Sequence, residues 1–236
     1  MGIPTPTRSF LLTKHRAVPA CRSAAVALLA LIVGCAHGTA GRAATLAPGS
    51  SATPLPASAA TASSLRQLLD GQMAPEAAIP WASGRPLTWS DFQGSPPDGG
   101  RESALTAYAL YYAWKCRGPT FEFRVVAGFR PHRSWVKRVV LNDTTESRRT
   151  LHHEQTHFDI AEVHARRMRR YFATLTTACQ RSDAQLEALA QRFVSEEREA
   201  QRRYDDETSH GLHRGPQAAW NDRIAGQLAE TRADAP

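Results

Sequence analysis

Apolar residues recur every three or four positions along one long stretch of the chain, which is the spacing of one face of an α-helix. This stripe consists of Leu151, Phe158, Ala161, Ala165, Met168, Phe172 and Leu175. Asp143, with Glu146 three residues later, has the pattern of a capping box at the helix start, and Thr144 is the alternative cap. The pattern predicts an amphipathic helix from this cap to about Ala178.

A second helix with similar spacing follows the first. Ser182 or Asp183 begins it, and Gly211 ends it. Its first apolar positions are Leu186, Leu189 and Phe193. In an antiparallel hairpin, residues equally far from a tight turn meet at the same height. A turn near residue 180 therefore places residues 204–210 beside residues 153–157.

Ahead of the helices, apolar and smaller or polar residues alternate, which is the period of a half-buried β-strand. The alternating apolar positions are Tyr108, Leu110, Tyr112 and Trp114, and then Phe121, Phe123 and Val125. Gly118 and Pro119 supply the turn between two strands, and a third strand is expected around residues 134–141. We therefore expect an α+β fold, in which a small antiparallel sheet precedes a long antiparallel helical hairpin, and we expect the aromatic residues to belong to its core.

The N-terminal segment, residues 1–34, has the order of a secretory signal: a basic start, an apolar run from Ala24 to Val33, and then Gly34. The run is too short to span a bilayer comfortably. Residues 32–35, Ile-Val-Gly-Cys, resemble the bacterial lipobox, in which cleavage leaves an acylated cysteine at the new N-terminus. We expect Cys35 to be this lipidation site, in a cell-envelope lipoprotein on the periplasmic face of the outer membrane. The alternative is an ordinary cleaved signal.

Residues 35–64 are predicted to be a disordered tether, because 25 of the 29 residues from 36 to 64 are Ala, Gly, Ser, Thr or Pro. Leu65, Leu68 and Leu69 indicate one short amphipathic turn at the start of a folded domain over residues 65–230. The net charge of +7 comes mostly from the leader, since the chain after residue 34 has 25 basic and 22 acidic side chains. This balance argues against nucleic acid as a partner.

The first predicted helix contains His153-Glu154-Gln155-Thr156-His157. Residues four apart lie on one helix face, so His153 and His157 can share one metal ion, and zinc accepts nitrogen ligands in tetrahedral geometry. Glu154 is not needed as a ligand. Its carboxylate would hang beside the metal as a general base for water.

The third ligand must come from elsewhere in the chain. Glu162 faces the opposite side of the helix, and His164 lies about 13 Å along the axis from the two ligands, so both are expected to have structural roles. The hairpin leaves five candidates: Asp205, Asp206, Glu207, His210 and His213. We expect His210, because neutral imidazole suits zinc, with Glu207 as the next choice. His210 could instead cap the second helix.

Two further cysteines remain in the exported chain, Cys116 and Cys179, and export favours a disulfide between them. The alternative, a thiol ligand, is disfavoured because Cys179 lies about 33 Å along the helix from His157 at 1.5 Å per residue.

The chain resembles a family of bacterial secreted zinc-dependent proteases that is catalogued as a domain of unknown function, with a zincin-like His-Glu-x-x-His. The resemblance covers roughly residues 85 to 225. It rests on Leu87-Thr88-Trp89-Ser90-Asp91-Phe92, Ser134-Trp135, residues 153–162, Thr208-Ser209-His210-Gly211, Gln217 and Trp220. The resemblance implies a zinc peptidase. The metzincin continuation of the motif, with a third histidine, is absent.

We therefore expect a zinc-dependent peptidase of the bacterial cell envelope, anchored to a membrane by lipid and acting on a peptide or protein. Zn²⁺ would be held by His153, His157 and a third side chain, with Glu154 as base. The alternative is a non-catalytic envelope lipoprotein that binds metal for structure or binds a partner protein.

Overall fold

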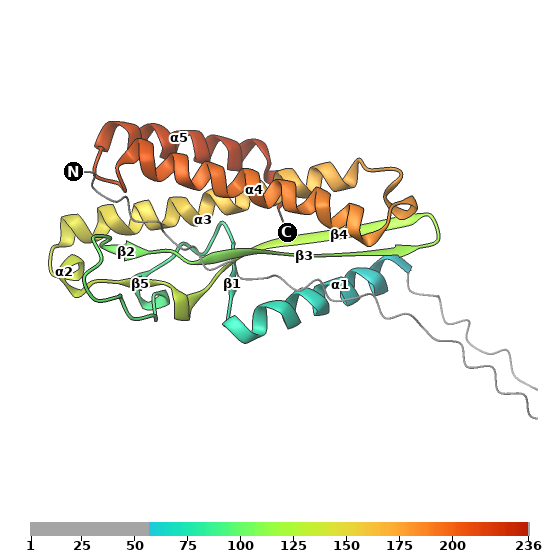
Figure 1. Cartoon of the computed structure of the whole chain (residues 1–236), viewed down its shortest axis with the longest axis horizontal. Coiled ribbons are helices and arrows are strands. Elements are labelled where there is room, and N and C mark those ends of the chain that lie inside the picture. Colours follow the sequence, from blue (N-terminus) through green and yellow to red (C-terminus); the bar gives the residue numbers. More distant parts are fainter. Residues whose placement is uncertain (1–56, 236) are drawn as a thin grey trace, which may run out of the picture. The chain divides into compact units, whose positions relative to one another are not determined.

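The structure is a computed structural model that describes residues 57–235, in which helices pack against a small antiparallel sheet (Figure 1). The fold class is α+β, as predicted. The elements are α1 (Ala57–Met73), β1 (Ile79–Pro80), β2 (Ala104–Leu105), β3 (Tyr108–Arg117), β4 (Thr120–Phe129), β5 (Trp135–Val136), α2 (Arg138–Leu141), α3 (Thr144–Ala173), α4 (Asp183–Thr208) and α5 (Arg214–Glu230). Short 3₁₀ turns lie at η1 (Ala74–Glu76), η2 (Trp89–Asp91), η3 (Pro131–Arg133), η4 (Ala178–Gln180) and η5 (Arg232–Asp234).

The predicted hairpin of two strands is confirmed, since β3 and β4 pair antiparallel from Tyr108↔Phe129 to Arg117↔Thr120. Gly118 in the connecting turn has a φ of 55°, a left-handed conformation that favours glycine. The prediction of a third strand over residues 134–141 was wrong. The strand there is β5, of two residues, and it pairs with β2 in a separate two-stranded sheet, while residues 138–141 form α2.

The third strand of the main sheet is instead β1, which pairs with the last two residues of β4. Loop contacts explain why the chain around Ser134 does not join β4. The Ser134 hydroxyl donates to the Arg130 carbonyl, and the Ser134 carbonyl accepts a hydrogen bond from Gly94 N–H. These bonds occupy the backbone where the predicted strand would have started.

The predicted tether ends at residue 64, and in the structure α1 begins at Ala57. Alanine is the best helix former, so a segment rich in alanine continues a helix whose later turns are anchored in the core. Leu65 and Leu69 supply that anchor and are buried. The signal segment, Cys35 and the rest of the tether lie outside the described residues.

The predicted helical hairpin is confirmed by α3 and α4, which pack against each other along their lengths. Asp143 caps α3, accepting hydrogen bonds from the N–H groups of Thr145 and Glu146 at 2.8 and 3.0 Å. Ser182 caps α4 in a capping box with Gln185. α3 ends at Ala173, earlier than the predicted residue 178, and the remaining residues form a turn and η4.

A third helix, α5, had no counterpart in the sequence-based prediction. It runs alongside α4 (Figure 1) and packs against both α3 and α4, and its buried residues are Gln217, Trp220 and Ile224. Within residues 57–235, no helix has both the length and the apolar character needed to cross a bilayer.

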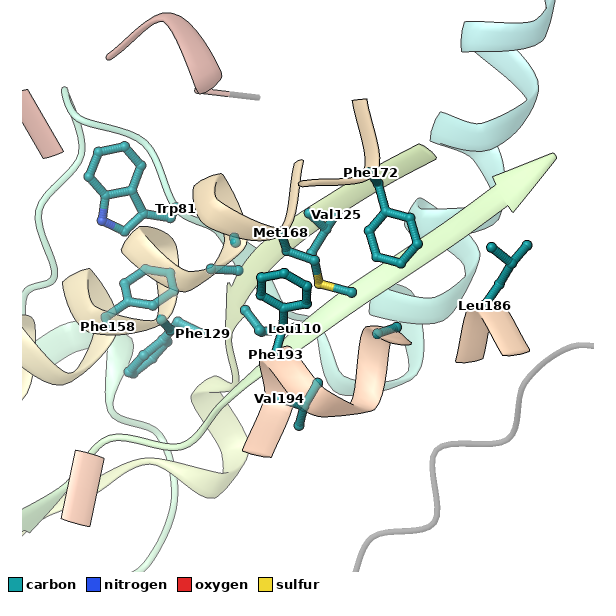
Figure 2. Packing of buried hydrophobic residues seen from close by; sticks show 14 of the residues in the cluster. Trp81, Leu110, Val125, Phe129, Phe158, Met168, Phe172, Leu186, Phe193 and Val194 are labelled. Atoms are coloured by element: carbon teal, nitrogen blue, oxygen red, sulfur yellow. The ribbon is translucent and has the colours of Figure 1, made fainter. Parts of the chain in front are cut away.

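The main core fills the space between the sheet and the α3–α4 hairpin (Figure 2). Phe158, Met168 and Phe172 of α3 face Val125 and Phe129 of β4, and all five are almost fully buried. The strand aromatics pack against this cluster, as expected: Tyr108, Tyr112, Trp114, Phe121 and Phe123. The core therefore fixes α3 on the sheet and leaves the opposite face of α3 to the other helices.

A disulfide joins Cys116, near the end of β3, to Cys179 in η4. This is the pair expected from the sequence. The bond ties the tip of the strand hairpin to the loop between α3 and α4, at the end of α3 away from His153.

Two backbone carbonyl groups on the outer edge of β4 accept hydrogen bonds from groups outside the sheet. Trp81 N–H donates to the Ala127 carbonyl at 2.9 Å, and Arg169 Nε donates to the Val125 carbonyl at 3.0 Å. A cleft of about 1000 Å³ runs beside this edge, between α1 and the end of α3.

Candidate metal centre

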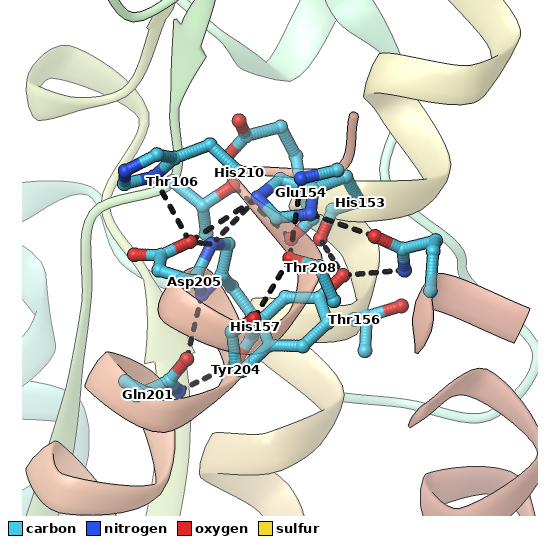
Figure 3. Close-up of polar contacts among 12 residues, drawn as sticks. Thr106, His153, Glu154, Thr156, His157, Gln201, Tyr204, Asp205, Thr208 and His210 are labelled. Carbon is cyan, nitrogen blue, oxygen red and sulfur yellow. Dashed lines mark hydrogen bonds and ion pairs between the residues drawn. The ribbon is translucent and has the colours of Figure 1, made fainter. Parts of the chain in front are cut away.

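His153 and His157 lie on successive turns of α3 and face α4 (Figure 3). His153 is buried and His157 is nearly so. The two rings are almost perpendicular, with 4.7 Å between their centroids, and their Nε2 atoms are 3.1 Å apart. His153 and His157 therefore lie on one face of the helix, as predicted.

The Nδ1 atom of His153 lies 3.0 Å from Gln217 Oε1. The orientation of this amide is fixed, because Gln217 Nε2 donates to the Tyr204 hydroxyl at 2.6 Å and to Asn221 Oδ1 at 2.7 Å. The Tyr204 hydroxyl can accept that bond because its own hydrogen goes to the His153 carbonyl, at 3.2 Å. Gln217 Oε1 must then accept from His153, so the imidazole carries its proton on Nδ1.

Gln201 fixes His157 in the same way. Its Nε2 donates to the His157 carbonyl at 2.8 Å and to Glu197 Oε1 at 2.7 Å, which leaves Oε1 to accept from His157 Nδ1 at 2.6 Å. Both imidazoles therefore turn the lone pair of Nε2 toward the same point. Two lone pairs 3.1 Å apart repel each other unless a proton or a cation lies between them.

Asp205 of α4 supplies a third acceptor at this point. Its Oδ1 lies 3.4 Å from His153 Nε2 and 3.1 Å from His157 Nε2. The Oδ1 atom itself is buried. One ligand atom from each of these three residues lies within 4.8 Å of the others. Two imidazole nitrogens and a carboxylate oxygen are a donor set that zinc accepts.

The electrostatics of the cluster favour a positive charge. Burial alone would lower the pKa of His157, but the neighbouring Asp205 carboxylate outweighs burial and raises that pKa to about 9. Burial would likewise raise the pKa of Asp205, yet the hydrogen bonds and charges of the two imidazoles hold it well below its usual range. A metal cation in place of the His157 proton would be attracted by the same Asp205 carboxylate.

Glu154 lies beside the cluster and is buried. Its Oε2 has no hydrogen-bond partner within residues 57–235, while its backbone carbonyl accepts from the Thr106 hydroxyl at 3.2 Å. The Glu154 carboxylate is near enough to contribute to the raised pKa of His157. Oε2 therefore keeps its acceptor lone pairs available to a donor that enters the site.

Gly211 closes the cluster against His153. Its φ is 82°, and a Cβ at this position would lie 3.0 Å from His153 Cγ. Only glycine meets both conditions, the left-handed backbone and the close approach to the ring.

Neither His210, the expected third ligand, nor Glu207, the next choice, belongs to the group formed by His153, His157 and Asp205. His210 is exposed, and its Nδ1 lies 3.4 Å from Asp205 Oδ1, on the outside of the group of three. Glu207 Oε2 accepts a hydrogen bond from Trp220 Nε1 at 2.6 Å. Asp205 was one of the five candidates that the hairpin left open. The assignment of His210 stays a prediction.

Glu162 has the structural role that was expected, because it is fully buried in ion pairs with Arg166 and Arg169. Gln201 and Gln217 are the site residues whose role the sequence analysis missed. In the predicted hairpin, residues equally far from the turn near residue 180 lie side by side, so residues near 157 face residues near 203. This relation could have identified Gln201. Gln217 required α5, which was not predicted.

Comparison with known proteins gives one match. The family described as "Bacterial protein of unknown function (DUF922)" matches residues 94–211, which include His153, Glu154, His157 and Asp205. No curated protein and no solved structure matches the chain.

Proposed function

The chain belongs to the DUF922 family of bacterial proteins, and we propose that this member is a zinc-dependent peptidase whose metal is held by His153, His157 and Asp205. The observation that carries the proposal is the convergence of three lone-pair acceptors on one point, beside the buried Glu154, whose Oε2 has no hydrogen-bond partner among residues 57–235. A bound zinc ion supplies Lewis acidity there, polarising a carbonyl and lowering the pKa of water.

The remaining steps fall to side chains of the chain itself. Gln201 and Gln217 keep the Nδ1 protons in place, so that both Nε2 atoms stay available. Glu154 takes the proton from the attacking water and returns it to the amine that leaves.

The proposal includes a place in the cell and a substrate class. Acylation of Cys35 would anchor the protein to the cell envelope, on the periplasmic face of the outer membrane, and the substrate would be a peptide or protein in that compartment. One acyl chain binds a membrane only marginally, so two or three chains are needed for a firm anchor.

The test is Glu154→Gln in the full chain. We expect the zinc content to stay the same and the hydrolysis of a mixed peptide library to fall by at least about 100-fold, because general acid–base help is typically worth about 10² to 10⁴ in rate. Glu199→Gln, an exposed glutamate of α4, is the matched control and should keep full activity. If wild type binds zinc but cleaves no peptide, or if Glu154→Gln cleaves as fast as wild type, the peptidase proposal fails.

A second candidate function has a specific observation in its favour. His210 Nδ1 lies only 3.4 Å from Asp205 Oδ1, so a small movement would add a fourth protein ligand. A site closed by four protein ligands is typical of structural zinc, as in the non-catalytic envelope lipoprotein that the sequence leaves as an alternative.

The zinc content of two variants distinguishes the open peptidase site from the closed structural site. In the peptidase site, Asp205→Ala should lose zinc and His210→Ala should keep it, since His210 is outside the set of three. If His210→Ala loses zinc while Asp205→Ala keeps it, His210 is the third ligand, as expected from the sequence. If both variants lose zinc, the closed structural site is favoured.

A further inference from the structure

A second cavity lies where α3, α4 and α5 meet, apart from the metal centre. Its volume is about 100 Å³. The floor is made of buried residues and the rim of long exposed ones (Figure 1 shows the three helices). The lining residues are Ile160, His164, Arg167, Ala200, Arg203, Trp220, Arg223, Ile224 and Gln227.

The lining carries three arginines, one from each helix, and no acidic side chain among the described residues. Arg223 is held over the Trp220 ring, with its guanidinium carbon 4.3 Å from the ring centroid. Among the described residues, Arg167 pairs with one carboxylate, that of Glu196, at 3.9 Å, which is near the outer limit of an ion pair. Arg203 has no ion pair within residues 57–235. Three cations around one small cavity repel each other unless an anion joins them.

His164 lies at the bottom of this arrangement. It is buried, and its Nδ1 has no hydrogen-bond partner among the described residues. Burial, and after it the charges of Arg167 and Arg203, lower the pKa of His164 to about 4. A neutral imidazole keeps one N–H that can donate to an anion.

We propose that this cavity binds a phosphate-sized oxyanion. Arginine forks match the oxygens of phosphate in paired hydrogen bonds, and stacking on Trp220 holds one fork in place. A volume of about 100 Å³ suits a single tetrahedral group. The anion is either free phosphate or the phosphodiester of a lipid headgroup, since both present the same oxygens. Nothing in this proposal depends on zinc or on hydrolysis.

Calorimetric titration of the full chain tests the site, with inorganic phosphate and dimethyl phosphate as the two probes. Wild type should show saturable binding of one equivalent of at least one probe. Arg203→Ala and Arg223→Ala should each weaken binding by about 10-fold or more, because each removes a charge-assisted hydrogen bond. Arg202→Ala, the neighbouring exposed arginine outside the cavity, is the matched control and should change binding less than about 2-fold.

The two probes distinguish the source of the anion. Tighter binding of inorganic phosphate supports a free phosphate ligand, and equal binding of dimethyl phosphate supports a lipid headgroup. All three replaced arginines are exposed, so their loss should not unfold the chain. The proposal is overturned if neither probe binds saturably, or if Arg202→Ala weakens binding as much as Arg203→Ala does.

Discussion

At the scale of single residues, the positions of two protons decide whether the histidine pair can bind a metal. An imidazole with its proton on Nε2 would point a donor at the centre and repel a cation. Gln201 and Gln217 prevent this, because the N–H groups of each amide are already committed elsewhere. The amides therefore act on the metal centre through the imidazoles.

We expect Gln201→Ala and Gln217→Ala each to weaken zinc binding by about 10- to 100-fold, the usual effect of losing a partner of a ligating histidine. Competition with a chelator measures the affinity, and nitrogen NMR of the imidazoles reports which nitrogen carries the proton. Gln217→Glu keeps an acceptor facing His153 and should restore most of the affinity. Gln191→Ala, a glutamine of α4 bonded to Tyr112 and Glu187, is the control. Equal affinities of Gln201→Ala and Gln191→Ala would refute this role.

His164 makes the fold sensitive to acid. Its pKa in the folded chain is about 4, against 6.5 for the free side chain. Between these values the unfolded chain binds the proton and the folded chain does not, so the free energy of unfolding falls as pH drops from about 6.5 to 4. The loss should reach roughly 2 to 3 kcal/mol, at about 1.4 kcal/mol per pKa unit.

Urea unfolding in phosphate-free buffer at several pH values measures this loss. His164→Gln cannot gain the charge, so its stability should depend less on pH over the same window. Parallel curves for the two proteins would mean that other groups cause the acid sensitivity.

At the scale of elements, the disulfide and the metal centre lie at opposite ends of α3. The bond between Cys116 and Cys179 closes a loop with a sequence separation of 63. Loop closure of this length restricts the unfolded chain and stabilises the fold by about 4 kcal/mol in the chain-entropy description. The double variant Cys116→Ser, Cys179→Ser should lose about 2 to 4 kcal/mol in urea unfolding and keep its zinc. Loss of zinc would mean that the disulfide positions the centre.

Elements with a long apolar period could be predicted from the sequence, and those set by their neighbours could not. The stripe on α3 and the cap at Asp143 gave the helix and the two histidines directly. α5 presents few apolar residues to the rest of the chain, chiefly Trp220 and Ile224, so its pattern is too sparse to detect. Its Gln217 was missed for the same reason.

The predictions of short elements were wrong for a related reason. A two-residue strand such as β5 is too short to show an alternation of apolar and polar residues. Val139 and Leu141 have the spacing of one strand face, yet both are exposed on α2. The third acceptor depended on which turn of α4 faces His157. The hairpin left five candidates between residues 205 and 213, and the side-chain packing around Tyr204 then brought Asp205 rather than His210 into the group.

At the scale of the whole molecule, the candidate centre exists only where three helices meet. α3 gives the imidazoles, α4 gives Asp205 and Gln201, and α5 gives Gln217. A fragment limited to the α3–α4 hairpin would therefore keep the three acceptors and lose the partner that orients His153.

The bonds of Trp81 and Arg169 to the edge of β4 have a consequence for how copies of the chain behave together. A strand with free carbonyl and N–H groups along its side is a template on which another chain can add a strand. Arg169→Ala would free the Val125 carbonyl, remove a charge from the cleft beside it, and leave the buried Glu162 with Arg166 as its ion-pair partner among the described residues. We expect this variant to form oligomers that grow with concentration in light scattering, whereas Arg170→Ala, whose guanidinium pairs with Asp234, should stay monodisperse to the same degree as wild type.

If Arg169→Ala stays as dispersed as wild type, the bond to Val125 has no protective role. If it associates while its stability in urea unfolding stays close to that of wild type, the Arg169 guanidinium protects this edge from strand addition. Copies crowded side by side on a lipid surface would then depend on it most.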